Sequence, residues 1–226
     1  MSGAADGHDP IACPLPLIIA IDGPAGSGKS TLARRLAGHY TLRFLDTGLL
    51  YRAVARRLLD KGIAAANETA AVDEAKALTP EDLDGDRLRG EGIGNQASIV
   101  AAIPAVREAL LGVQRQIAAR DRGSVVAGRD IGTVIVPETR FKFFITASIE
   151  ERARRRHEEL LKRGDKPIYA RVLDELRERD RRDEARAVAP MTIAADATVI
   201  DTSNLSVDQT FEAIRNLVDE KLGASA

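Results

Sequence analysis

The glycine-rich segment at residues 23–30, Gly-Pro-Ala-Gly-Ser-Gly-Lys-Ser, constrains the fold of this chain more than any other feature. It fits the phosphate-loop pattern G-x-x-x-x-G-K-[ST] at every fixed position. An apolar run over residues 17–21 precedes the segment and predicts a strand, and a helix-like run follows from Thr31. Strand, glycine loop and helix form the context in which this pattern encloses a phosphate group. The segment therefore predicts a binding site for a nucleoside triphosphate.

Each residue type in this loop has a physical role. Glycines let backbone N–H groups curl around a phosphate without clashes from Cβ atoms, and the following helix N-terminus adds its positive dipole end. Lys29 can reach the β- and γ-phosphates, and the Ser30 hydroxyl can bind Mg²⁺. The predicted triphosphate-binding residues are Gly23, Pro24, Ala25, Gly26, Ser27, Gly28, Lys29, Ser30 and Thr31.

The charge of the chain is nearly balanced, with a formal net charge of −1 over 226 residues. This balance argues against a general nucleic-acid-binding protein. Arginines nevertheless cluster at residues 152–156 and 177–186, and localised arginine in a neutral chain favours a small phosphorylated ligand. The alternative is a solvated helix face held by ion pairs between residues four apart.

Cysteine use and hydropathy bear on location. The single cysteine, Cys13, excludes an internal disulfide and fits a reducing compartment. No apolar run reaches the length of a membrane span, and residues 1–10 lack the basic start of a signal peptide. We expect residues 1–16 to form a mobile extension because three prolines break it. These features predict a cytoplasmic protein with no membrane partner.

The remaining pattern alternates apolar strand-like runs with amphipathic helices, which predicts a parallel sheet covered by helices on both faces, a three-layer α/β/α fold. We expect Thr47 to cap the second helix and Ser148 to form a capping box with Glu151. Asp84-Gly85 signals a hairpin turn. The predicted strands are 17–21, 42–45, 124–127, 141–147 and 197–200, and the predicted helices are 31–39, 49–60, 67–76, 95–100, 104–120, 149–161, 168–181 and 205–222.

Polar residues follow several of these strands. In a parallel sheet, ligands bind outside the carboxyl ends of the strands, so Asp22, Asp46 and residues 128–130 should meet in one crevice beside the phosphate loop. A guanine-reading GTPase would carry an Asn-Lys-x-Asp strand end, and a motor ATPase would carry an apolar strand ending in Asp-Glu; neither occurs. Arginines around the crevice favour phosphoryl transfer between two phosphorylated ligands, a reaction stabilised by arginine and Mg²⁺.

Five segments together resemble the bacterial cytidylate kinases of the nucleoside monophosphate kinase superfamily. The resemblance extends from about residue 18 to 222, and its most specific parts are Gly-Arg-Asp-Ile-Gly-Thr-Val and Arg-Asp-Arg-Arg-Asp. It implies one phosphate-loop kinase domain over 17–226, with an insert that binds the nucleoside monophosphate (NMP) and a helical lid. The segments are 19–30, 45–53, 97–98 with 104–107, 128–134, and 179–183 with 186–190; the insert is about 63–103 and the lid about 162–190.

The resemblance also implies an acceptor, CMP or dCMP, and a donor, ATP with Mg²⁺. By this resemblance, Arg52, Arg129 and Arg186 grip the acceptor phosphate. Ser98, Arg107 and Asp130 read the cytosine edge, where a carboxylate accepts from the exocyclic amino group and Arg or Ser donates to N3 and O2. Arg155 contributes on the ATP side. The implied catalytic set is Lys29, Arg129, Arg179 and Arg186, and the implied acceptor set is Thr47, Tyr51, Arg52, Ser98, Arg107, Arg129, Asp130, Arg179, Asp183 and Arg186, with Arg179 and Asp183 on the ribose.

The chain departs from the family pattern in two places. The family often has Asp before Gly-Arg-Asp, where this chain has Ala127, and residues 79–91 leave room for a hairpin but not for a full three-stranded insert. A monomer is the family's default. Two alternatives stay open on the residues alone: a kinase for another small acceptor, such as AMP, shikimate or a nucleoside, and a nucleotide-binding regulatory module that has no acceptor.

Overall fold

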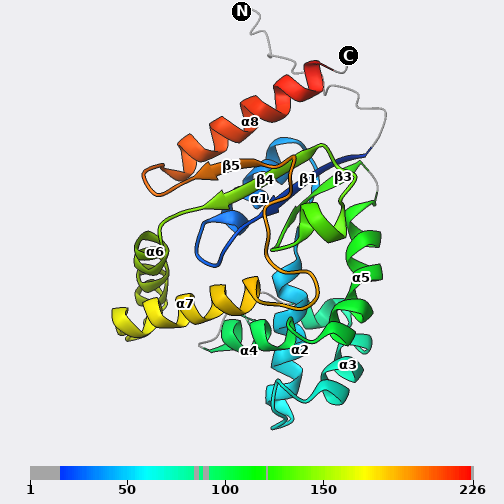
Figure 1. Cartoon of the computed structure of the whole chain (residues 1–226), viewed down its shortest axis with the longest axis vertical. Coiled ribbons are helices and arrows are strands. Elements are labelled where there is room, and N and C mark those ends of the chain that lie inside the picture. Colours follow the sequence, from blue (N-terminus) through cyan, green and yellow to red (C-terminus); the bar gives the residue numbers. More distant parts are fainter. Residues whose placement is uncertain (1–15, 84–86, 89–91, 121, 225–226) are drawn as a thin grey trace, which may run out of the picture.

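The computed structural model describes residues 16–83, 87–88, 92–120 and 122–224 (Figure 1). Its centre is a five-stranded sheet of order β2-β3-β1-β4-β5, and every neighbouring pair is parallel. This architecture confirms the predicted α/β fold and parallel sheet. The strands are β1 Leu17–Asp22, β2 Arg43–Asp46, β3 Gly123–Ala127, β4 Phe141–Thr146 and β5 Thr198–Asp201.

Helices cover both faces of the sheet because the strand residues alternate in direction. Ile19 and Ile21 of β1 pack on one face with α1 (Lys29–His39) and α8 (Val207–Gly223). Ala20 points to the other face, where it packs against the C-terminal end of α5 (Pro104–Ala118) and the turn at residues 131–135. The near-continuous burial of β1, β3 and β4 is typical of parallel strands covered on both sides.

A second group of helices extends away from the sheet in Figure 1 and forms its own apolar core. This helical body contains α2 (Thr47–Asp60), α3 (Glu68–Lys76), α4 (Ile93–Val100) and part of α5, and a short 3₁₀ turn, Pro80–Leu83, lies beside α2. α6 (Ile149–Lys162) and α7 (Tyr169–Glu184) pack on each other through Leu160 and Leu176, and Ala25 of the phosphate loop joins that contact.

The structure corrects two predicted helix caps. Asp46, not Thr47, caps α2: its Oδ1 accepts from Gly48 N at 3.0 Å, while the Thr47 hydroxyl donates to Ala127 O at 3.0 Å. At α6 only half of the capping box forms. Ser148 Oγ accepts from Glu151 N at 3.3 Å, but the Glu151 carboxylate pairs with arginines one turn later in the same helix. The Glu151 carboxylate binds the charged arginines more strongly than it would bind a neutral backbone N–H group.

Other boundaries shift by one to three residues, as helix ends commonly do. α4 begins at Ile93 instead of residue 95, and α5 ends at Ala118 instead of residue 120. The expected turn at Asp84-Gly85 lies outside the described residues. Within the described ranges no single helix has the length and apolar composition of a membrane span; α4 and α5 meet that criterion only jointly, across a bend of 97°.

Candidate functional site

The phosphate loop connects β1 to α1 in a conformation that needs glycine. Gly23 has φ +138°, and a Cβ atom there would lie 2.0 Å from Ile145 O. Any larger residue at position 23 would therefore prevent the loop from packing against β4. Lys29 opens α1 and is buried. Its Nζ donates to Pro24 O and, at 3.3 Å, to Ser27 Oγ, both within the loop. These bonds fix the Lys29 ammonium group beside the backbone of the loop.

A cavity of about 400 Å³ opens next to this loop, at the carboxyl ends of the strands. Its walls come from the loop, the starts of α1 and α2, the end of β3, and α6 and α7. Among the residues predicted for the site, it is lined by Ala25, Gly26, Gly28, Lys29, Ser30, Thr31, Arg52, Arg129 and Arg179. The cavity is strongly cationic, and of the strand-end residues expected to meet there Asp46, Gly128 and Arg129 line it. Asp22 and Asp130 do not line it, because Asp22 accepts from the backbone of Ile131 and Gly132 and Asp130 pairs with Arg107.

The cavity also contains charged residues that sequence reasoning missed. Arg34 of α1 lines it, as do Arg156 and Glu159 of α6 and the adjacent Arg163. The signal for three of them was available, because positions 156, 159 and 163 are spaced by three and four residues and so share one helix face. The 152–156 arginine cluster pointed to this helix but not to the face that turns inward.

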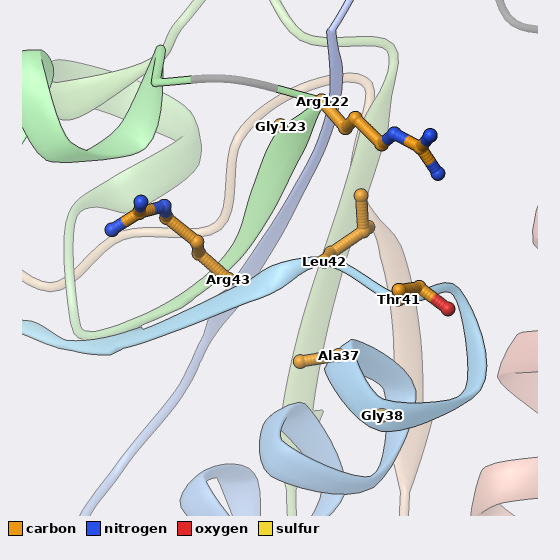
Figure 2. Close-up of a pocket in the computed structure, with 7 residues that line it drawn as sticks. All are labelled: Ala37, Gly38, Thr41, Leu42, Arg43, Arg122 and Gly123. Atoms are coloured by element: carbon orange, nitrogen blue, oxygen red, sulfur yellow. The ribbon is translucent and has the colours of Figure 1, made fainter.

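A second hollow, of about 540 Å³, lies at the opposite edge of the sheet between the end of α1 and the starts of β2 and β3. Figure 2 shows that the Arg43 and Arg122 side chains extend in different directions and do not converge on one point. It is larger than the first cavity, but it lacks the loop amides and converging cations that a phosphate site needs. We therefore assign function to the cavity beside the phosphate loop.

Asp183 of α7 brings together three arginines at the cavity and next to it. Its carboxylate pairs with Arg129 Nε at 2.9 Å and with Arg186, and Arg179 Nε lies 3.9 Å away. Ser98 Oγ of α4 donates to the same carboxylate at 2.8 Å. Burial by itself would raise the pKa of Asp183, but the three arginines hold that pKa at about 2. One buried carboxylate thus joins the end of β3, the helical body and α7.

The predicted cytosine-reading residues fall into two groups. Arg107 of α5 pairs with Asp130, and both side chains are buried. The Arg107 guanidinium also lies 5.5 Å from the centre of the Tyr51 ring, so these three residues meet. Ser98 was expected beside Arg107 and Asp130, but its hydroxyl bonds to Asp183 instead. The structure therefore places Ser98 with the group expected to hold ribose and phosphate.

Ser30 and Asp46 form the oxygen-rich corner of the cavity. Ser30 Oγ donates to Asp46 Oδ2 at 2.7 Å, and Asp46 is the register partner of Ala127 on the neighbouring strand. Ala127, the position where the family often has Asp, is buried and supplies no carboxylate. Hard cations such as Mg²⁺ prefer hydroxyl and carboxylate oxygens, so this pair of residues fits a magnesium ion.

Two arginines of α6 support the phosphate loop from outside the cavity. Arg155 was predicted on the ATP side; its guanidinium donates to Thr202 O at 2.6 Å and Thr202 Oγ1 at 3.0 Å, and Thr202 Oγ1 lies 3.5 Å from Ser27 O of the loop. Arg152 was not singled out. It donates to Ala25 O at 3.1 Å and to Asp180 Oδ2 at 2.6 Å, so it joins the phosphate loop to α7.

The electrostatics of the cavity favour an anion. Burial lowers the pKa of Lys29 well below its ordinary value, and neighbouring Arg129 and Arg179 lower it further. Burial, with repulsion from Arg129, likewise lowers the pKa of Arg179. Cations brought together in a low-dielectric site repel one another. Phosphate groups of a bound nucleotide would supply the missing negative charge.

Comparison with known proteins agrees with this geometry. The family described as Cytidylate kinase matches residues 19–220. A cytidylate kinase from Methylocella silvestris is 53% identical over 203 residues, covering 90% of this chain and 94% of that protein. One from Brucella suis is 50% identical over 207 residues, covering 92% and 94%. A crystal structure of an uncharacterised protein from Eubacterium ventriosum aligns with TM-score 0.51 at 17% identity, covering 90% and 98%, which shows a shared fold alone.

Proposed function

The chain belongs to the cytidylate kinase family, and we propose that the cationic cavity is where it transfers the γ-phosphoryl group of ATP to CMP or dCMP. The observation that carries this proposal is the convergence of Lys29 from the donor loop with Arg129 and Arg179 on one cavity, next to the buried Arg107–Asp130 pair. A donor-phosphate loop and a group able to read a base therefore lie on either side of the same arginines.

The reaction needs positioning and charge stabilisation more than covalent chemistry. A phosphate oxygen of CMP attacks the γ-phosphorus of ATP, the bond between that phosphorus and the β–γ bridging oxygen breaks, and ADP leaves. Lys29, Arg129 and Arg179 neutralise negative charge on the transferring group, and Arg52 and Arg186 hold the acceptor phosphate. A phosphate oxygen is already a nucleophile, so no residue has to act as a general base.

We assign the metal site to Ser30 and Asp46. When bound, Mg²⁺ neutralises and orients the donor phosphate oxygens. Phosphate-loop proteins commonly hold this ion with the loop Ser or Thr and a carboxylate after a strand. Because β3 ends in Ala127, Asp46 of the adjacent β2 takes the place of that carboxylate, and its 2.7 Å contact with Ser30 Oγ supports the assignment.

Substituting Asp46→Asn should raise the Mg²⁺ concentration needed for half-maximal rate by about tenfold or more, the usual cost of losing a residue that supports a metal site. The same variant should bind Mn²⁺ more weakly in the presence of ATP, measured by electron paramagnetic resonance. Asp73→Asn, an exposed change on α3, is the control and should alter neither quantity. An unchanged metal requirement in Asp46→Asn would remove Asp46 from the site.

Asp130→Asn tests the base-reading role. A carboxylate accepts from the amino group of cytosine and faces the carbonyl of uracil unfavourably, whereas an amide can donate to that carbonyl. We expect the preference for CMP over UMP in kcat/KM to fall by about 10- to 100-fold, the range for one good base contact. The affinity for ATP should stay within about twofold. Equal losses for CMP, UMP and ATP would contradict this role.

The first test of the function is ADP formation from Mg·ATP with CMP, dCMP, UMP, AMP and GMP offered separately. Stimulation by CMP and dCMP supports the proposal, and stimulation by another acceptor would keep the kinase chemistry but discard the roles of Arg107 and Asp130. ATP binding without stimulation by any acceptor would favour a regulatory module.

We further propose that residues 63–103 act as the NMP-binding insert and residues 162–190 as the lid, in one domain over 17–226. α7 supports the lid assignment, because its Arg179 lines the cavity and its Asp183 pairs with Arg129. Its Asp180 pairs with Arg152, which in turn donates to Ala25 O of the phosphate loop. A monomer in the cytoplasm, with no nucleic-acid or membrane partner, completes the proposal and fits the balanced charge of the chain.

A further inference from the structure

The turn that follows Asp130, next to the cavity-lining Arg129, has an unusual start. Residues Ile131–Ile135 form a single π-helical turn, and Asp130 occupies its N-cap position. An aspartate at this position ordinarily accepts hydrogen bonds from the N–H groups of its own turn. Here the Asp130 side chain makes no such bond, because its carboxylate pairs with Arg107. Ile131 and Gly132 are buried, so some other acceptor must satisfy the N–H groups at the start of the turn.

Asp22, distant in sequence, supplies that acceptor. Its Oδ1 accepts from Ile131 N at 2.8 Å and its Oδ2 from Gly132 N at 2.8 Å. Asp22 is the last residue of β1 and directly precedes the phosphate loop.

We propose that Asp22 is a positioning residue for acceptor recognition: by capping the 131–135 turn from β1, it leaves the Asp130 carboxylate free to pair with Arg107 and to read the base. Without Asp22, the bare N–H groups of Ile131 and Gly132 would draw the Asp130 carboxylate back onto its own turn. This inference rests on the proposed function and adds a residue that touches neither substrate. It also joins the donor loop and the acceptor-reading turn through one side chain.

The environment of Asp22 supports a dedicated role. Its side chain is buried, and burial raises its pKa to about 6 although the bonds from Gly132 and Ile131 oppose that rise. Asp130 raises the pKa of Asp22 further and Lys29 lowers it. A buried carboxylate costs free energy unless it is well paired, and the two backbone bonds supply that pairing while satisfying two buried N–H donors.

The test is a double-mutant cycle between Asp22→Asn and Asp130→Asn, with kcat and KM measured for CMP, UMP and ATP. We expect Asp22→Asn to lower the preference for CMP over UMP by about tenfold, mainly through the KM for CMP, and to leave the KM for ATP within about twofold. In the Asp130→Asn background it should lower the preference no further. Ser206→Ala removes a backbone cap at α8 at a residue that does not line the cavity, and it controls for a general loss of stability.

Each outcome decides something. A wild-type protein that does not phosphorylate CMP would overturn the proposed function and this inference with it. If the wild type prefers CMP, two results would overturn only the role of Asp22. Either Asp22→Asn keeps that preference, or Asp22→Asn lowers it by the same factor in the wild-type and the Asp130→Asn backgrounds. A rise in KM for CMP and ATP together would mean that Asp22 merely holds the fold.

Amide hydrogen exchange of the wild-type protein tests the cap itself and does not depend on any variant folding. The N–H groups of Ile131 and Gly132 should exchange slowly, because Asp22 holds both. Exchange at the rate of an unprotected chain would overturn the cap.

Discussion

Replacing Lys29 with methionine is expected to lower kcat by about three orders of magnitude, which corresponds to about 4 kcal/mol of lost transition-state stabilisation. Methionine has nearly the length of lysine but carries no charge, so the loop geometry is kept while the cation on the donor phosphates is removed. The measurement is ADP formation at saturating Mg·ATP and CMP.

The same substitution should not destabilise the free protein. Burial and the neighbouring arginines lower the pKa of Lys29 in the folded state, so folding works against its charged form. A neutral side chain relieves that repulsion, and the melting temperature of Lys29→Met should equal or exceed that of the wild type. A fall in turnover together with a stable fold therefore reports on chemistry. Lys76→Met, an exposed change on α3, is the control, and turnover of Lys29→Met within about tenfold of wild type would contradict the mechanism.

Replacing Asp183 with asparagine is expected to lower the free energy of unfolding by about 3–5 kcal/mol, the cost of breaking a buried ion pair by removing one partner. Among the described residues, the ion pairs of Arg129, Arg179 and Arg186 all end on this carboxylate. Asparagine keeps the shape but leaves these buried cations without a counter-charge. Domains are typically stable by only about 5–15 kcal/mol, so the loss should be large in thermal or urea unfolding.

An added anion should separate this explanation from a simple packing defect. Inorganic phosphate should raise the melting temperature of Asp183→Asn more than that of the wild type, because it replaces the lost negative charge. Asp208→Asn breaks an exposed ion pair with Arg35 and should cost no more than about 1 kcal/mol. A loss in Asp183→Asn no greater than in this control would show that Asp183 does not hold the arginines together.

The stabilising effect of Asp183 also has a defined pH dependence. Its pKa is about 2 in the folded protein against an ordinary value of 3.8. A carboxyl group whose pKa is lowered by folding contributes stability above its unfolded pKa and loses that contribution as pH falls through the folded value. The difference in stability between wild type and Asp183→Asn should therefore shrink as the pH is lowered from about 4 to about 2.

Much of the fold was predictable because its signals are local. The phosphate loop, the apolar strand before it and the helix after it are neighbours in sequence, and each depends on its own residue types. The alternation of strands and helices likewise predicted the parallel sheet. The caps were less predictable: Asp46 caps α2 instead of Thr47, and the Glu151 carboxylate pairs with arginine instead of accepting from the backbone. Local rules rank possible partners, but tertiary neighbours decide among them.

The candidate site was predictable as a set of residues more than as a set of contacts. The family resemblance brought Arg107 and Asp130 together, and the structure pairs them. The resemblance did not predict the bond between Ser98 and Asp183 or the position of Arg156 and Arg163 at the cavity. Nor did it predict that Asp22 caps the 131–135 turn. These contacts depend on which helix faces and strand ends the fold brings side by side.

The sequence by itself determined the phosphate loop, the α/β class and the family, because glycine conformations, hydrophobic periodicity and motif spacing are properties of short stretches of chain. Only the tertiary structure decided the partners of the buried charges. Asp183 meets Ser98 across 85 residues of sequence, and Asp22 meets Ile131 across 109. The free energy of burying a charge depends on every group around it, and those groups become neighbours only when the sheet and its helices have packed.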